Sequence, residues 1–219
     1  MGGCVPIAGL NQRAEDFISQ RMALRALPFR PDISIHTPTP QSGLIGWLAA
    51  EGLDNVAPYW AYAWGGGAAL ALYLRDHPQL PAGRTVLDFG TGSGLVGIAA
   101  AKAGAARVWV LDKDPIAPIA ARLNAQANGV VLDLWDQPGL PEADIILAGD
   151  VFYDEAVVAE TMPILMQAAS AGTRVFVGDP FRRSLPLARL DLLAEYDVDD
   201  MGGKTPVHAG VFALHSRTI

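Results

Sequence analysis

Cysteine is nearly absent from the sequence: Cys4 is the only one among 219 residues. A single cysteine cannot build a disulfide framework or a thiolate metal cluster, so we expect a reducing, cytoplasmic setting. The four histidines are scattered without the spacing of metal ligands, and no metal site is predicted. The first residues lack a basic start followed by an apolar run, and no signal peptide is expected.

Positive charge is scarce as well. The chain holds 16 Lys and Arg residues against 23 Asp and Glu residues, which gives a formal net charge of -7. Binding to a phosphate backbone needs a broad basic surface, so we expect no nucleic-acid partner. A cationic partner that carries lysines would suit this charge better.

Charge is missing altogether from residues 56–74, a stretch long enough to raise the question of a membrane helix. The stretch contains Pro58, three consecutive glycines at 65–67 and three tyrosines. These residues favour a turn that leads into a buried helix, and we expect no association with a membrane.

Hydrophobic residues make up 51% of the chain and charged residues only 18%, which suits a sheet buried on both faces. From residue 84 onward, patterns typical of strands and helices alternate, which predicts crossover connections and a parallel α/β sheet. The predicted strands are 85–88, 107–112, 130–134, 143–148, 174–178 and 207–215, and the predicted helices are 94–103, 115–126 and 155–169.

The two ends of the chain are less regular. We predict a helix over 14–27, an extended irregular segment over the proline-rich 28–40, and a short strand or helical turn at 44–48. After residue 179 the pattern predicts a helix near 185–193 and a polar strand near 196–199. Residues 1–55 are thus expected to form an N-terminal extension packed on a core domain of residues 56–219.

A glycine-rich turn is the strongest signal in the chain. Residues 86–94 (VLDFGTGSG) follow a short predicted strand and open an alanine-rich helix. Gly90, Gly92 and Gly94 allow the backbone to turn sharply and to approach a ligand closely. The helix then presents unpaired N–H groups at its first turn.

Two kinds of cofactor compete for this turn, because residues 92–97 also match the dinucleotide pattern G-x-G-x-x-G. The strand, however, ends at Asp88, four residues before that match begins, and an acid there would repel a pyrophosphate. An acid followed by G-x-G-x-G suits a phosphate-free cofactor with a cationic methionine portion, namely S-adenosyl-L-methionine. Asp88 could contact that portion directly or through water. A glycine turn that merely caps a strand is the structural alternative.

A second acid, Asp112, ends the next predicted strand, 24 residues after Asp88. A carboxylate at this place can accept hydrogen bonds from both ribose hydroxyls of a nucleoside. Both kinds of cofactor use such a residue. Asp112 therefore predicts a nucleoside but does not choose between the two.

The glycine turn, Asp112 and the order of strands and helices together resemble the class I methyltransferases. This resemblance implies a Rossmann-like, seven-stranded, mostly parallel sheet flanked by helices, with an antiparallel last strand and an N-terminal helical extension. It also implies S-adenosyl-L-methionine as the cofactor.

Three further motifs resemble the protein-lysine methyltransferase group: PYWAYAW at 58–64, DVFY at 150–153 and GDP at 178–180 with Arg182. Within that group, residues 112–117 and 149–154 look most like the electron transfer flavoprotein β-subunit lysine methyltransferases. The resemblance covers roughly residues 30 to 180 and implies a monomer that methylates lysines of that β subunit. A small-molecule amine methyltransferase and, more distantly, an NAD(P)-dependent reductase are the alternatives.

The predicted catalytic residues are Asp150 and Tyr153. Asp150 follows the fourth predicted strand, where ligands of open α/β sheets gather, and would orient the incoming amine and relay its proton through water. Its alternative role is to cap the helix that starts near Glu155. Tyr153 would add a hydrogen bond or a ring wall, although a lone tyrosine there could simply pack.

Aromatic residues complete the predicted cofactor site. Trp60 and Trp64 would form its walls, although aromatics at this spacing equally suit a core. Trp135, just after the third predicted strand, would lie beside the adenine. Asp179 and Arg182 follow the fifth predicted strand and would contact the substrate, unless they only form a turn.

Overall fold

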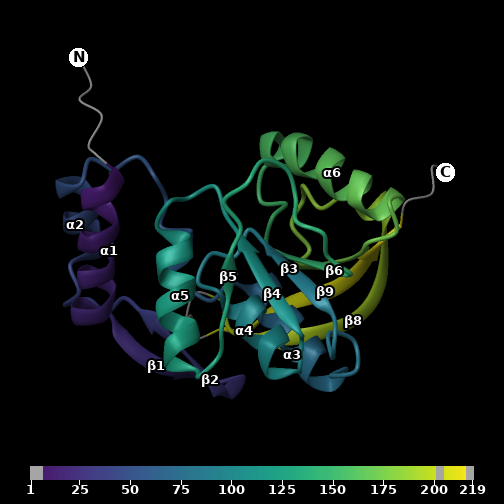
Figure 1. Ribbon diagram of the computed structural model, residues 1–219, viewed down its shortest axis with the longest axis horizontal. Helices are drawn as coiled ribbons and strands as arrows, with labels where there is room; N and C mark the ends of the chain where they lie inside the picture. The colour runs from purple at the N-terminus through teal and green to yellow at the C-terminus, as the bar shows by residue number, and fades with distance from the viewer. Residues whose placement is uncertain (1–6, 201–204, 216–219) are drawn as a thin grey trace.

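A seven-stranded sheet forms the centre of the computed structural model, which describes residues 7–200 and 205–215 (Figure 1). Its strands are β3 (Thr85–Phe89), β4 (Arg107–Leu111), β5 (Asp133–Leu134), β6 (Ile145–Gly149), β7 (Arg174–Asp179), β8 (Leu190–Val198) and β9 (Val207–Leu214). Their order across the sheet is β5-β4-β3-β6-β7-β9-β8. The last strand, β9, is antiparallel to both of its neighbours, whereas the other pairs are parallel. The predicted fold class is confirmed.

Helices cover both faces of this sheet. Figure 1 places α3 (Gly65–Asp76) and α4 (Leu95–Lys102) on one side and α6 (Glu155–Ser170) on the other. Neighbouring residues of a strand point to opposite faces, so Ile145 and Leu147 belong to the core beneath α3 and α4, whereas Ile146 joins the core beneath α6. Burial of both faces explains why the strands carry so few charges.

The N-terminal part contains α1 (Ile7–Arg21), a hairpin of β1 (Ala23–Leu27) and β2 (Arg30–Thr37), α2 (Leu44–Ala50) and the short helix η1 (Tyr59–Ala61). The prediction of a helix over 14–27 was wrong at its end, because the chain leaves the helix at Arg21 and enters β1. The prediction of an extended, irregular segment over 28–40 was right about the extended backbone but wrong about its irregularity, since most of the segment forms β2. Pro31 is tolerated there because, among the described strands, β2 pairs with β1 alone.

The free edge of β2 is satisfied by a helix. Asn128 is the C-cap of α5 (Ala117–Ala127). Its side chain accepts a hydrogen bond from Ser34 N at 2.9 Å and donates one to Ser34 O at 2.6 Å. Asn124 of the same helix accepts from His36 N at 2.8 Å. These side chains fasten the N-terminal hairpin to the domain that carries the sheet.

The C-terminal part corrects a second prediction. The expected helix over 185–193 is a single short turn, η2 (Leu187–Arg189), followed directly by β8. A bulge between Leu192 and Ala194 breaks the alternation of β8, which is why its leucines imitate helical spacing. The expected third strand, 130–134, shrinks to the two residues of β5.

The uncharged stretch 56–74 runs through η1 into α3, as predicted. The first eight residues of α3 are buried in the core, and so is Leu74. The absence of charge from this stretch therefore reflects its burial. In the part of the chain that the structure describes, every helix is too short or too polar to cross a membrane.

Candidate active site at the carboxyl ends of the central strands

The glycine turn between β3 and α4 requires glycine at all three predicted positions. Gly90, Gly92 and Gly94 have φ values of 70°, 50° and 81°, a region that other residues rarely adopt. A Cβ at Gly94 would lie 2.8 Å from Cα of Ala121, so α5 packs directly on the turn. A Cβ at Gly92 would meet nothing closer than 3.8 Å, which leaves this part of the turn open to a ligand.

Asp88 lies beneath the turn and is only 1% exposed. Its Oδ2 accepts hydrogen bonds from Thr91 Oγ1 at 2.7 Å and from Gly97 N at 2.8 Å. Burial raises the pKa of Asp88 to about 6, although both hydrogen bonds act to lower it. The carboxylate thus ties the turn to α4, and its contact with a cofactor stays a prediction.

Asp112 follows β4 and holds the turn from its other side. Its Oδ2 accepts from Gly92 N and its Oδ1 from Asp114 N, both at 2.9 Å. Burial raises the pKa of this carboxyl as well. A carboxylate offers about four lone-pair sites, and with the amide of Lys113 three are used, so about one remains for a ribose hydroxyl. The open turn at Gly92 and the remaining acceptor site of Asp112 fit S-adenosyl-L-methionine.

Asp150 directly follows β6 and has a strained backbone, with φ at 58°. Its Oδ2 accepts from Gly67 N at 2.7 Å, and its Oδ1 accepts from Arg182 Nη1 at 2.7 Å. The N-cap of α6 is Asp154, so the alternative role of Asp150 as that cap is wrong. Burial raises the pKa of Asp150, whereas Arg182 and the amides of α3 lower it.

Arg182 joins Asp150 to Asp179, the last residue of β7. The same Nη1 atom of Arg182 lies 3.0 Å from Asp179 Oδ2, and Arg182 N donates to Asp179 Oδ1 at 2.7 Å. Asp179 is fully buried, and burial raises its pKa. Burial lowers the pKa of Arg182, but the two carboxylates outweigh it and leave the pKa raised. The structure therefore brings the two predicted substrate residues into one ion cluster with Asp150.

The three glycines that begin α3 explain how its amides reach Asp150. A Cβ at Gly66 would lie 2.1 Å from the carbonyl oxygen of Gly178, and a Cβ at Gly149 would lie 2.9 Å from Cα of Gly67. Only glycines let the helix approach the ends of β6 and β7 this closely. The positive end of the α3 dipole consequently faces the Asp150 carboxylate. We did not predict this contact, although the glycine triplet was a signal for it.

Backbone strain marks the same edge of the sheet. Among the described residues other than glycine, Asp150 and Phe181 are the two with positive φ. They follow the adjacent strands β6 and β7. Residues held in such conformations cluster at active sites, which points to this edge independently of any motif.

Of the two predicted tryptophan walls, only Trp64 lies in an aromatic cluster near Tyr153. Trp64 Nε1 donates to Tyr59 O at 2.8 Å, and the Tyr59 ring lies 5.4 Å from the Trp64 ring and 5.1 Å from the Tyr153 ring. Trp60 is 1% exposed and packs edge-on to Trp47 in the core, so cofactor contact by its ring stays a prediction. Tyr59, 43% exposed, was missed because its neighbours carried the same aromatic signal.

Trp135 lies apart from these residues. Its ring packs edge-on to Trp109 at 5.3 Å, and its Nε1 donates to Gly139 O. It lines a cavity of about 580 Å³ together with Thr85 and Arg107, the first residues of β3 and β4. The structure thus groups Trp135 with the amino ends of the strands, and a contact with adenine stays a prediction.

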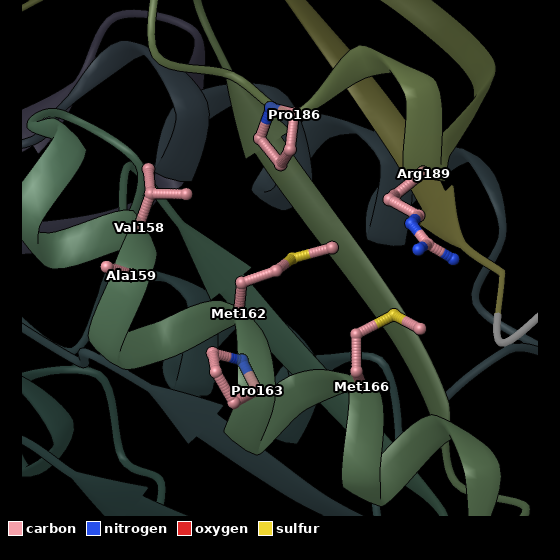
Figure 2. Close-up of a pocket in the computed structure, with 7 residues that line it drawn as sticks. All are labelled: Val158, Ala159, Met162, Pro163, Met166, Pro186 and Arg189. Atoms are coloured by element: carbon pink, nitrogen blue, oxygen red, sulfur yellow. The ribbon is translucent and has the colours of Figure 1, made fainter. Parts of the chain in front are cut away.

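A second hollow, of about 350 Å³, lies on the flank of α6. Figure 2 shows Met162 and Met166 extending from α6 toward the segment that holds Pro186 and Arg189. None of the predicted site residues lines this hollow.

Comparisons with known proteins match the chain to methyltransferases. A family model described as ribosomal protein L11 methyltransferase (PrmA) matches residues 68–169. The electron transfer flavoprotein beta subunit lysine methyltransferase of Mus musculus is 40% identical over 161 residues, which cover 69% of this chain and 62% of the mouse protein. The chain thus spans less than two thirds of that relative.

The relative of the same name from Xenopus laevis is matched over more of its length. It is 36% identical over 195 residues, which cover 84% of this chain and 78% of the frog protein. A solved putative RNA methyltransferase from Pyrococcus horikoshii shares the fold, with a TM-score of 0.54 and 13% identity over 72% of this chain and 88% of that one. On these matches, the chain belongs to the family of electron transfer flavoprotein beta subunit lysine methyltransferases.

Proposed function

We propose that the chain is an S-adenosyl-L-methionine-dependent protein-lysine N-methyltransferase that acts on the β subunit of electron transfer flavoprotein. The substrate follows from the names of its relatives in mouse and frog. The structural observation that carries the proposal is the fixed carboxylate of Asp150. Cγ1 of the next residue, Val151, lies 3.0 Å from the Cβ position of Gly90, so the segment that carries this carboxylate passes beside the glycine turn.

The cofactor would lie on the open turn at Gly90 and Gly92, with a ribose hydroxyl on Asp112. When bound, S-adenosyl-L-methionine supplies a methyl group already activated by a sulfonium. The protein then has mainly to bring the nucleophile into line with that group.

Asp150 would orient the acceptor amine. Gly67, Gly66 and Arg182 use three of the roughly four acceptor sites of its carboxylate, so it can still accept one hydrogen bond from an incoming N–H. A lysine must lose a proton before it can attack, although its ordinary pKa is about 10.4. A partly buried slot beside the bound cofactor disfavours the ammonium and lowers that pKa. Asp150, whose side chain is 11% exposed, is open enough to receive the proton through water.

Transfer of a labelled methyl group tests the proposal. The full chain is incubated with methyl-labelled cofactor and the purified β subunit, and the product is digested and sequenced by mass spectrometry. We expect the label on lysine side chains of the β subunit. Label only in small metabolites of a cell extract would favour the amine methyltransferase instead. Binding of NAD(P) without binding of S-adenosylhomocysteine would favour the reductase.

A further inference from the structure

Three rings form a continuous aromatic surface next to the candidate site. Tyr59 stands at its centre, with ring centroids 5.1 Å from Tyr153 and 5.4 Å from Trp64. We call these three residues the aromatic wall. Tyr59 is 43% exposed, so the wall is accessible to a ligand from outside the chain.

The wall lies between the two parts of the candidate site. On one side, the carbonyl oxygen of Tyr59 is 3.8 Å from the Cβ position of Gly92, on the open part of the glycine turn. On the other side, Tyr153 follows Asp150 by three residues, and Trp64 is the N-cap of α3, whose Gly67 amide holds the Asp150 carboxylate. A side chain that lies on the wall would therefore lie between the turn and the two segments that carry and hold the Asp150 carboxylate.

The wall already binds one ammonium group. The Nζ atom of Lys113 lies 5.9 Å from the centroid of the Tyr153 ring. A hydrogen bond to Tyr153 raises the pKa of Lys113. Aromatic faces attract such cations through the ring quadrupole. The Lys113 contact shows that a cation can lie against the Tyr153 ring of this wall.

We propose that Tyr59 is a substrate-binding residue. Together with Tyr153, it binds the alkylammonium group of the acceptor lysine before that side chain moves to its position beside Asp150. This inference rests on the proposed function, because it takes a lysine as the acceptor. This role differs from the cofactor wall that the sequence suggested for the neighbouring Trp60, whose ring is buried in the core.

The test compares Tyr59→Leu with Tyr59→Phe, which keeps the ring. The matched control is Tyr196→Leu, since Tyr196 lies on β8 and donates to Asp76 at the far end of α3. Using the full chain and the β subunit, we expect Tyr59→Leu to raise KM for the β subunit about 5- to 30-fold. Tyr59→Phe and the control should stay within about twofold of the wild type. The affinity for S-adenosylhomocysteine should be unchanged in all three variants.

Two outcomes would overturn the inference while leaving the proposed function intact. One is an unchanged KM in Tyr59→Leu when the wild type methylates the β subunit. The other is a loss of S-adenosylhomocysteine affinity without a change in KM, which would assign the wall to the cofactor.

A second readout does not depend on methyl transfer. Tetramethylammonium chloride is added to the full chain, and saturation transfer from the protein to its methyl protons is measured by NMR. We expect a clear signal with the wild type and Tyr59→Phe, and at least a roughly threefold weaker signal with Tyr59→Leu. Equal signals from all variants would contradict the role of Tyr59 even if the β subunit were not the substrate.

Discussion

Arg182 Nη1 lies 2.7 Å from Asp150 Oδ1, so the cation that follows β7 neutralises the carboxylate that follows β6. The two residues are 32 positions apart in the chain, and the parallel pairing of β6 with β7 brings them together. Since both side chains are largely buried, this contact controls the charge at the centre of the candidate site.

Arg182→Met should therefore move the pH dependence of the reaction. Arg182 lowers the pKa of Asp150 against the effect of burial, and its removal raises that pKa further. If the ionised carboxylate is required, the acidic limb of kcat/KM moves to higher pH, and kcat at pH 7 falls about 10- to 100-fold. A pH profile of methyl transfer measures this shift, and Arg182→Lys should restore part of it. A uniform loss of activity at every pH would indicate a merely structural role.

Gly92→Ala and Gly94→Ala form a matched pair within the glycine turn. Gly94→Ala would place a methyl group 2.8 Å from the backbone of Ala121, and we expect it to lower the free energy of unfolding by at least about 2 kcal/mol. Gly92→Ala meets no such obstacle and should cost only about 1 kcal/mol of backbone strain.

For cofactor affinity, the variant with the larger expected effect is instead Gly92→Ala. A methyl group at Gly92 projects from the open part of the turn, so Kd for S-adenosylhomocysteine should rise roughly tenfold. Calorimetry on folded Gly92→Ala measures this change. An unchanged Kd would mean that the cofactor does not lie on the turn.

Asp88 gives a prediction on stability and pH. Its pKa is about 6 in the folded chain, above its ordinary value of 3.8, so the folded state keeps a proton that the unfolded state releases between these values. The free energy of unfolding therefore falls as the pH rises from about 4 to about 6.

Asp88→Asn removes this titration but keeps an oxygen for Thr91 and Gly97 to bind. The free energy of unfolding of the variant, minus that of the wild type, should rise by about 3 kcal/mol between pH 4 and pH 7, as measured by urea unfolding. A difference that is the same at both pH values would show that Asp88 is not buried as a neutral acid.

Much of the fold could be predicted from the sequence because its signals are local. The alternation of strands and helices, the glycine turn and the acids at strand ends each occupy a few adjacent residues. The hairpin of β1 and β2 was missed because its β2 strand is held by contacts distant in the sequence, among them hydrogen bonds with Asn124 of α5 and with Asn128, the C-cap of that helix. β8 was mistaken for a helix because its bulge removes the alternation that identifies a strand.

The candidate site was predictable residue by residue but not as an arrangement. Asp150, Asp179 and Arg182 were each predicted, yet their shared ion cluster depends on the register of β6 against β7. The contact of Tyr59 with Tyr153 joins residues 94 positions apart and leaves no periodic trace in the sequence. Contacts of this kind follow from tertiary packing, which local patterns do not encode.

The catalytic role of Asp150 is the central claim. Asp150→Asn is the fitting variant, because asparagine tolerates the φ of 58° and keeps the shape of the side chain while losing its charge. The decisive measurement is mass-spectrometric quantification of methyl groups on the purified β subunit after incubation with the wild type or with Asp150→Asn. We expect at least about 100-fold slower methylation by the variant, with unchanged affinity for S-adenosylhomocysteine. Equal rates of lysine methylation by the two proteins would contradict the assignment.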